Sequence, residues 1–297
     1  MTEELRADFG IEVSFALGTP DPSRVFRSMT ALIESFQSFD RELVQTIDVK
    51  IEPVLLLEDI EIGSLKTWLR NAISSVDDSA LRDGDWKKVV GAYLLRSKYI
   101  LVRKLDGKTE ITNRQEIKEI EAEIWEAAKA TDVQRIPTYR PISDAKIIEV
   151  IGNLTAGLHQ LTTGDSAKLL TPDGEANFNL SLNISPDSLR DLLVKESVSN
   201  DATLILKVKR PDYLGESMWD FKLGDHPLQA KIVDLEWLLS FQERKVDVRP
   251  GDAIRAVVRQ TIHYGYEAQV VYEHNEIIQV LDVIAVAPYA QGHLLRD

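Results

Sequence analysis

The chain contains no cysteine among its 297 residues. This absence excludes a disulfide framework, a thiolate nucleophile and any zinc or iron–sulfur site with cysteine ligands. The chain also lacks an excess of basic residues, since 35 Lys and Arg stand against 48 Asp and Glu, for a net charge of −13 spread over both halves. Nucleic-acid binding depends on clustered Lys and Arg, so a long groove that follows phosphates is disfavoured.

Long hydrophobic runs are missing as well. The most apolar helical run, "VVGAYLLRSKYILV", is 14 residues long and contains Arg96 and Lys98, so it is too short and too charged to span a membrane. The first residues, "MTEELRADFG", are acidic and lack the apolar region of a signal peptide. We therefore expect a cytoplasmic protein with no membrane span.

What is present is an ordinary globular composition, with 44% hydrophobic and 28% charged residues. The length favours two domains, each able to bury a core without covalent links.

The first part of the chain predicts a strand, a long helix and two further strands. In "IEVSFALG" the apolar residues alternate, which is typical of a strand. "TPDPSR" then favours a helix start with Asp21 as the N-cap, and apolar positions at helical spacing continue to about Gln45. The stretch from Val49 to Asn71 alternates on either side of Gly63-Ser64, which predicts two antiparallel strands.

Three helices are expected next. They correspond to "DWKKVVGAYLLRSKYILVRKL", to "TNRQEIKEIEAEIWEAAKA" and, after a break at Pro137–Pro141, to "SDAKIIEVIGNLTAGLHQL". Thr112 or Asn113 is the expected cap of the second helix, with Glu116 at capping-box distance from Asn113, and Ser143 is the expected cap of the third.

The polar, Gly-containing stretch 163–175 has no periodicity and is predicted to be a linker. Beyond it the pattern changes to a period of two, with a short helix after Ser185 and another at Leu235–Phe241. The predicted strands are Asn177–Asn183, Thr203–Lys209, Met218–Leu223, Leu228–Val233, Ala253–Thr261, Tyr266–Tyr272 and Ile277–Val286.

Short strands at close intervals indicate a small β-barrel. The predicted fold class is therefore α+β. It has an N-terminal antiparallel sheet with a long helix and a helical segment (1–165), followed by a small C-terminal β-barrel (175–297).

Within the second part, "MWDFKLGDHPLQAKIVDLEWLLSFQERKVDVRPGDAIRAVV" has a distinctive order of features. A Trp-x-Phe strand and a strand ending in Ile-x-Asp precede a short apolar helix, and Gly251-Asp252 precedes an apolar strand. This pattern resembles a small C-terminal β-barrel module of uncharacterised bacterial proteins, and the N-terminal elements with "EIGSL" are similar to their partner domain. The resemblance covers roughly 175 residues without the three middle helices, and it implies an architecture and a link to phage-defence genes, but no catalytic residues.

The residues of this motif have structural explanations. Asp234 precedes Leu235 and can cap the helix that carries Trp237. Pro250 and Gly251 favour a turn, and Asp252 can accept hydrogen bonds from the amides of that turn. We therefore expect this stretch to close the barrel.

Motifs for chemistry are scarce. No two of the five histidines have the spacing of a metalloprotease helix. His263 and His274 can approach each other across the last hairpin, near Glu273 and Glu276, but a metal there needs converging ligands. The chain has no phosphate-binding loop and no nucleophile elbow. We expect no cofactor, and we assign no catalytic or metal-binding residue.

Two surfaces remain as candidate interaction sites. The first helix of the middle segment is basic and aromatic, which is compatible with nucleic-acid contact or with packing against the acidic second helix. The tyrosines of the last hairpin can stack bases, anchor a protein partner or set strand register. The residues concerned are Lys87, Lys88, Arg103, Lys104, Tyr264, Tyr266 and Tyr272.

The favoured function is a non-enzymatic interaction or regulatory protein that binds a protein partner or a second copy of itself. The resemblance adds one specific form of this hypothesis, a subunit of a bacterial anti-phage defence assembly. The alternative is a module that binds nucleic acid or a small ligand through a barrel face and the basic helix at 86–105. A hydrolase with an unrecognised site is the third hypothesis.

Overall fold

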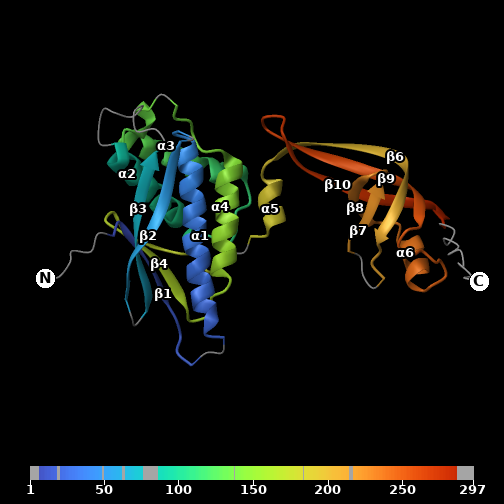
Figure 1. The fold of residues 1–297 in the computed structure, drawn as a ribbon, viewed down its shortest axis with the longest axis horizontal. Helices are drawn as coiled ribbons and strands as arrows, with labels where there is room; N and C mark the ends of the chain where they lie inside the picture. Colours follow the sequence, from blue (N-terminus) through green and yellow to red (C-terminus); the bar gives the residue numbers. More distant parts are fainter. Residues whose placement is uncertain are drawn as a thin grey trace, which may run out of the picture. The chain divides into compact units, whose positions relative to one another are not determined.

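The computed structural model describes residues 7–18, 21–48, 50–61, 64–75, 86–136, 138–182, 184–213 and 217–285. It is an α+β structure that divides into two compact units between Leu193 and Val194. The first unit combines a sheet with helices, and the second consists mainly of strands (Figure 1). None of the described helices is long and apolar enough to cross a membrane.

Unit 1 is built on a five-stranded antiparallel sheet with the order β2-β3-β1-β4-β5. Phe9, Ile11 and Val13 of the central strand are buried, while the intervening Gly10 and Glu12 point to the opposite face. The strands are β1 (Phe9–Ser14), β2 (Ile51–Glu61), β3 (Leu65–Ser75), β4 (Ser166–Thr171) and β5 (Gly174–Asn177).

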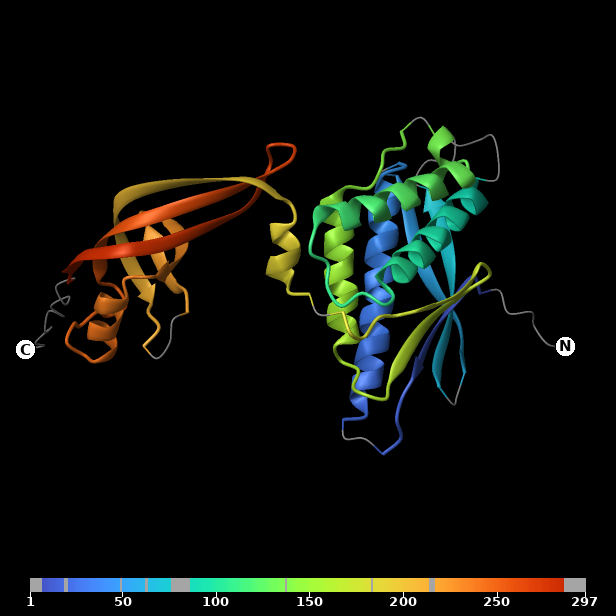
Figure 2. The same cartoon turned by 180° about the vertical axis from the view of Figure 1, so that it is seen from behind.

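Helices cover the buried face of this sheet. In Figures 1 and 2, α1 and α4 run side by side. Phe36 of α1 lies edge-on to Phe9, with ring centroids 6.1 Å apart. The helices are α1 (Ser23–Gln45), α2 (Trp86–Leu105), α3 (Arg114–Ala130), α4 (Asp144–Leu158) and the short α5 (Pro186–Asp191), with a 3₁₀ turn at Val133–Arg135.

Helix starts follow the predicted chemistry in part. The Asn113 side chain accepts from the Glu116 amide at 3.2 Å, which confirms Asn113 as the cap, and the Glu116 carboxylate reaches back to the Thr112 amide at 3.1 Å. The prediction for Asp21 is wrong, because Pro22 occupies the N-cap position of α1. Asp21 has φ +59° and its carboxylate binds Ser23 and Arg27 instead.

The predicted linker at 163–175 is also wrong. Ala167 and Leu169 of β4 are buried beside β1, and β4 continues into the hairpin with β5. The chain therefore leaves unit 1 only after Leu193, well beyond residue 175. The segment after β5, expected to be a strand over Asn177–Asn183, is irregular where it is described.

Unit 2 contains a five-stranded sheet whose pairings run in a ring, in the order β10-β8-β7-β6-β9. Most pairs are antiparallel, and β10 joins β8 in parallel through Glu276 with Lys231 and Ile277 with Ile232. The elements are β6 (Val194–Arg210), β7 (Trp219–Leu223), β8 (His226–Ile232), α6 (Leu235–Gln242), β9 (Ala253–Gly265) and β10 (Val270–Ile284).

The two strands predicted at Tyr266–Tyr272 and Ile277–Val286 are in fact one strand, β10, preceded by a turn at 265–269. Val286 lies outside the described residues. Likewise, β6 begins nine residues earlier than the predicted Thr203, at Val194. The strands of unit 2 are therefore longer than the sequence pattern suggested.

Asp234 before α6 and the turn residues Gly251 and Asp252 have structural roles, as expected. Asp234 accepts from the Trp237 amide at 3.2 Å and from the Val280 amide at 3.0 Å, so it caps α6 and also holds β10. Asp252 accepts from the Arg249 amide at 2.8 Å, and Gly251 has φ +105°. A left-handed conformation of this kind favours glycine.

Candidate functional site

Three strands of unit 2 continue beyond the ring. In Figures 1 and 2, β6, β9 and β10 extend together past β7 and β8. We call this extension the arm and define it as residues 194–201, 259–265 and 270–276. The register joins all three strands, since Val198 pairs with Ile262 and Ile262 with Glu273.

One face of the arm continues the buried face of the ring. Within the ring, this face carries buried residues such as Leu206, Ile254 and Ile277. Side chains alternate along a strand, so the same face of the arm carries Val198 and Ile262. Val198 is 50% exposed where the ring ends, and it lies among polar residues of the same face, including Gln260, which donates to Glu273 at 3.0 Å.

The opposite face of the arm is a polar ladder. Arg259 donates to both carboxylate oxygens of Asp201, at 2.8 and 2.9 Å. The Ser197 hydroxyl lies 2.8 Å from Nδ1 of His263. The His263 ring stacks on the Tyr272 ring, with ring centroids 4.1 Å apart. These contacts tie the strands together without assistance from a core.

The arm has two open edges, since β10 pairs with β8 only at Glu276 and Ile277, and the edge of β6 is the longer of the two. Residues 207–210 of β6 pair with β7, but residues 194–206 pair only with β9 and have no described strand on their other side. Backbone groups on such an edge are available to another strand. The edge includes exposed apolar side chains, with Ile205 56% and Val198 50% exposed.

The predicted interaction residues fall into both units. Tyr264, Tyr266 and Tyr272 lie on or beside the arm, and Tyr266 in the β9–β10 turn is 46% exposed. The basic residues Lys87, Lys88, Arg103 and Lys104 belong to α2 of unit 1. The structure therefore assigns the two predicted surfaces to different units.

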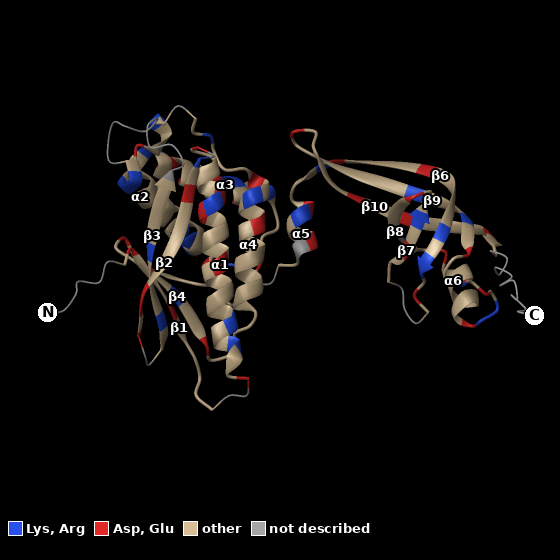
Figure 3. Ribbon diagram, viewed as in Figure 1, with Lys and Arg blue, Asp and Glu red and all other residues tan. Residues whose placement is uncertain are grey.

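The basic residues at the end of α2 contact the acidic helix. Arg103 and Lys104 both bind the Glu123 carboxylate of α3, at 2.8 and 2.7 Å. Lys98 is buried against Asp40 of α1, while Lys87 and Lys88 are exposed at the helix start. Figure 3 shows basic and acidic residues interspersed on both units. These contacts favour the packing interpretation of this helix over a continuous basic surface.

The histidines of the last hairpin do not converge on a common point. His263 contacts Ser197 and Tyr272, whereas His274 lies 3.3 Å from the Glu276 carboxylate. Among the described residues, no group of three His, Asp or Glu side chains is arranged to hold a metal ion.

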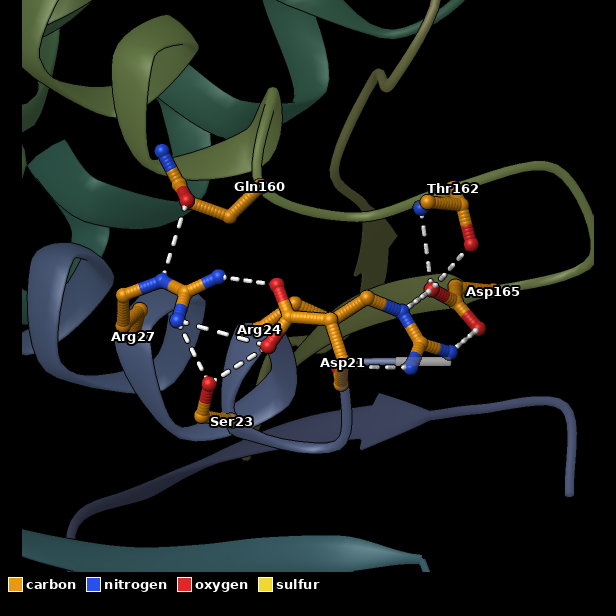
Figure 4. A network of polar contacts seen from close by, with 7 residues as sticks. All are labelled: Asp21, Ser23, Arg24, Arg27, Gln160, Thr162 and Asp165. Atoms are coloured by element: carbon orange, nitrogen blue, oxygen red, sulfur yellow. Dashed lines mark hydrogen bonds and ion pairs between the residues drawn. The ribbon is translucent and has the colours of Figure 1, made fainter. Parts of the chain in front are cut away.

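Unit 1 contains an apolar hollow at the start of α1. Its volume is about 490 Å³, and Leu17, Phe26 and Ile60 in its wall are 88%, 63% and 50% exposed. Figure 4 shows the polar network beside it, in which Arg24 donates to both oxygens of Asp165 at 3.0 Å.

Asp165 joins three segments of unit 1. It accepts from the amides of Ala16 and Thr162 at 3.0 and 2.9 Å, in addition to its bonds with Arg24. Burial opposes ionisation of Asp165, but these hydrogen bonds hold the pKa of its carboxyl well below the usual range. This network holds the loop before α1 against the loop after α4.

A second buried ion pair lies between α1 and α2. The ammonium of Lys98 binds the Asp40 carboxylate, and both side chains are essentially inaccessible to solvent. The ammonium also lies 3.3 Å from the Asn71 side-chain oxygen and 5.1 Å from the Phe9 ring centroid. Burial raises the pKa of Asp40 to about 6 and lowers the pKa of Lys98.

Sequence reasoning did not identify the β6 edge, the apolar hollow or the buried pairs. A weak signal for the edge existed, since "VKESVSNDATLILKVK" has no proline or glycine and is long enough for one continuous strand. Comparison of the chain with protein-family models, curated proteins and solved structures finds no match.

Proposed function

We propose that the chain is a non-enzymatic interaction protein and that the arm of unit 2 is its contact surface. The single observation that carries this proposal is the edge of β6 over residues 194–206, which has no described strand beside it. Natural proteins normally cover or interrupt such edges, because an uncovered edge recruits other strands. An edge retained over this length is best explained by a partner that pairs with it.

The other parts of unit 2 are consistent with a rigid support and a separate contact surface. In this proposal the ring of unit 2 is a small β-barrel that holds the arm rigid, and Asp234 fastens α6 to it. The β6 edge offers main-chain hydrogen bonds and the exposed apolar side chains of Val198 and Ile205. Both are the usual components of strand addition, with backbone bonds supplying affinity and side chains specificity.

A change at the edge tests this proposal. Val198→Lys places a charge on the β6 edge, and Val270→Lys places the same charge at a similarly exposed position on β10 of the arm. Association of the chain, whether with itself or with a purified partner, is expected to fall at least tenfold in Val198→Lys and to change little in Val270→Lys. Equal binding by wild type and Val198→Lys contradicts the proposal.

The assignment to a bacterial anti-phage defence assembly rests on the sequence resemblance alone. Its test is genetic: removal of the gene should lower the survival of phage-infected host cells, and Val198→Lys should reproduce that loss. Unchanged survival after gene removal rejects the assignment to a defence assembly. It does not contradict the proposal that the arm is a contact surface.

A small-ligand function has one specific observation in its favour, the apolar hollow of about 490 Å³ in unit 1. The Arg24 guanidinium beside it is already bound to Asp165, so the hollow suits an apolar ligand. An apolar fluorescent probe is expected to bind the native chain and to lose affinity in Phe26→Ser. Identical binding by both proteins rejects this second candidate.

A further inference from the structure

The edge of β6 is regular as well as open. Its register with β9 runs without a shift from Glu196 to Lys207. Residues 194–206 include no proline, and at about 3.3 Å per residue they extend over roughly 40 Å. Bulges, prolines and inward charges are the devices that protect an edge from pairing. Such devices lie at one end of this edge, in the register shift between Val194 and Glu196 and in the charges of Lys195 and Glu196, whereas residues 197–200 and 202–206 have none. The identity of the occupant can therefore be sought in the edge's own sequence.

A second copy of the same edge is a geometrically specific partner. Two identical strands pair in antiparallel fashion about a two-fold axis perpendicular to the sheet, and this axis keeps each face of the sheet on one side. Residues from the same face must therefore lie opposite each other, which requires one residue to face its own copy. A symmetric pairing is consequently defined by a single central residue.

Centring the pair on Val198 makes the edge complementary to itself. Val198 then faces Val198, and the flanking residues match in character on both sides. The opposed residues are Ser197 with Ser199, Glu196 with Asn200, Lys195 with Asp201 and Val194 with Ala202.

The charges on the existing sheet favour this centre. Glu276, Arg259 and Asp201 form one row across β10, β9 and β6, so the charges alternate from negative to positive to negative. Lys195 of a second copy extends the row with a positive charge. Lys195 lies at the register shift at the end of the edge, and its long flexible side chain can reach Asp201 from there.

A pairing centred on Asp201 would instead oppose like charges. An axis at Asp201 sets that carboxylate against its own copy and brings Lys195 opposite Lys207. Like charges directly opposite each other destabilise a strand pair.

The same arrangement places apolar side chains next to each other across the new strand pair. Val198 is 50% exposed and its neighbour on β9 is Ile262. Pairing about Val198 brings two copies of each of these side chains together on one face of a continuous sheet with the order β10-β9-β6-β6-β9-β10. Burial of apolar surface between these side chains stabilises the pair, in addition to the main-chain hydrogen bonds.

We propose that the β6 edge binds the β6 edge of a second copy of this chain, antiparallel and centred on Val198. This inference rests on the proposed function, since it names the occupant of the contact surface. It adds a stoichiometry, a symmetry and a register.

The absence of native cysteine makes a direct test possible. Directly opposed residues in antiparallel strands have Cα atoms about 4.5–5.5 Å apart, which is within the range of a disulfide. Val198→Cys is therefore expected to form a symmetric disulfide-linked dimer under mild oxidation, visible on a non-reducing gel. Val270→Cys is the matched control, because Val270 is 56% exposed on the same arm but lies on β10, away from this edge. It is expected to remain mostly monomeric.

Light scattering of the full chain supplies the second readout. The wild type is expected to have twice the monomer mass of 33.5 kDa, and Val198→Lys is expected to raise the dissociation constant at least tenfold, while Val270→Lys changes it less than twofold. A dimer that survives Val198→Lys, or one in which Val198→Cys crosslinks no better than Val270→Cys, overturns the inference.

The outcomes separate this inference from the broader proposal. A wild-type monomer at concentrations well above those in a cell overturns self-pairing. If Val198→Lys nevertheless abolishes binding to a purified heterologous partner, the arm remains a contact surface and only its occupant was wrong. A circular dichroism spectrum equal to that of the wild type confirms that each variant is folded.

Discussion

The two units use their sheets in different ways. In unit 1 one face of the sheet is covered by helices, and buried side chains from both layers form a single core. In unit 2 the buried cluster lies in the ring, in α6 and at Val248 after α6, and it includes no residue of the arm. The same strand, β6, contains both Leu206, which is fully buried, and Val198, which is half exposed. A buried and an exposed part are thus separated along a single strand in unit 2, and the proposed function assigns recognition to the exposed part.

The largest expected effect concerns the buried ion pair between Lys98 and Asp40 in unit 1. Lys98→Met and Asp40→Asn each leave one partner of the pair without its counter-ion in the core, and each is expected to lower the free energy of unfolding by about 3–5 kcal/mol. The double variant is expected to recover most of this loss, because it removes both charges. Urea unfolding of the four proteins measures the cycle, and a double variant less stable than either single one contradicts it.

The next effect contrasts the ring and the arm within β6. Leu206→Ala removes a fully buried side chain and is expected to destabilise unit 2 by about 2–5 kcal/mol. Val198→Ala on the same strand is expected to change stability by less than about 0.5 kcal/mol. Thermal unfolding below the self-association concentration tests the pair, and similar losses in both variants would show that the arm is part of the core.

A third comparison concerns helix caps in the two units. Asp234→Ala removes both the cap of α6 and the bond to the Val280 amide, and is expected to cost about 2 kcal/mol. Asn113→Ala removes only the cap of α3 and is expected to cost about 1 kcal/mol. Equal losses in denaturant unfolding would mean that the Val280 contact contributes nothing.

The smallest effect is a pH dependence that belongs to unit 1. The pKa of Asp40 is about 6 in the folded protein, above its ordinary value of 3.8, so the folded state holds the proton more tightly than the unfolded state between these values. Its contribution to stability is fully present below pH 3.8 and is lost as pH rises through 6. From about pH 5 to about pH 7 the loss is about 1 kcal/mol.

The control for this prediction is the double variant Asp40→Asn/Lys98→Met, in which neither member of the pair titrates. Lys98 faces Asp40 and Asp8, and Arg41 also acts on Asp40, so these charges set the background. The difference in the free energy of unfolding between wild type and double variant is expected to change by about 1 kcal/mol from about pH 5 to about pH 7. A constant difference contradicts the raised pKa of Asp40.

Much of the fold follows from local signals. The helix start at Asn113 and the cap at Asp234 depend on residues within three positions of each other, and both were predicted. The strand β4 was missed because its alternation spans only Ala167 and Leu169, and the polar turn after it was interpreted as linker. In retrospect "TPDGE" is the turn of the β4–β5 hairpin.

The candidate site was less accessible from sequence. The contact between Arg24 and Asp165 joins residues 141 positions apart, and no local pattern reports such a pair. The open edge of β6 depends on which strands are its neighbours, and this is decided by the pairing of β7 with residues 207–210 only. The tyrosines of the hairpin were found because aromatic residues are conspicuous, although the edge beside them was not.

The pairing of β6 with β9 also has a consequence for synthesis of the chain. Val194 pairs with Gly265 and Lys207 with Ala253, so residues 194–206 of β6 leave the ribosome many residues before β9, their pairing partner. Translation proceeds at about 5–20 residues per second, and contacts distant in sequence form late. Unit 1 precedes β6 in the chain, so its helices can form before β9 has been synthesised.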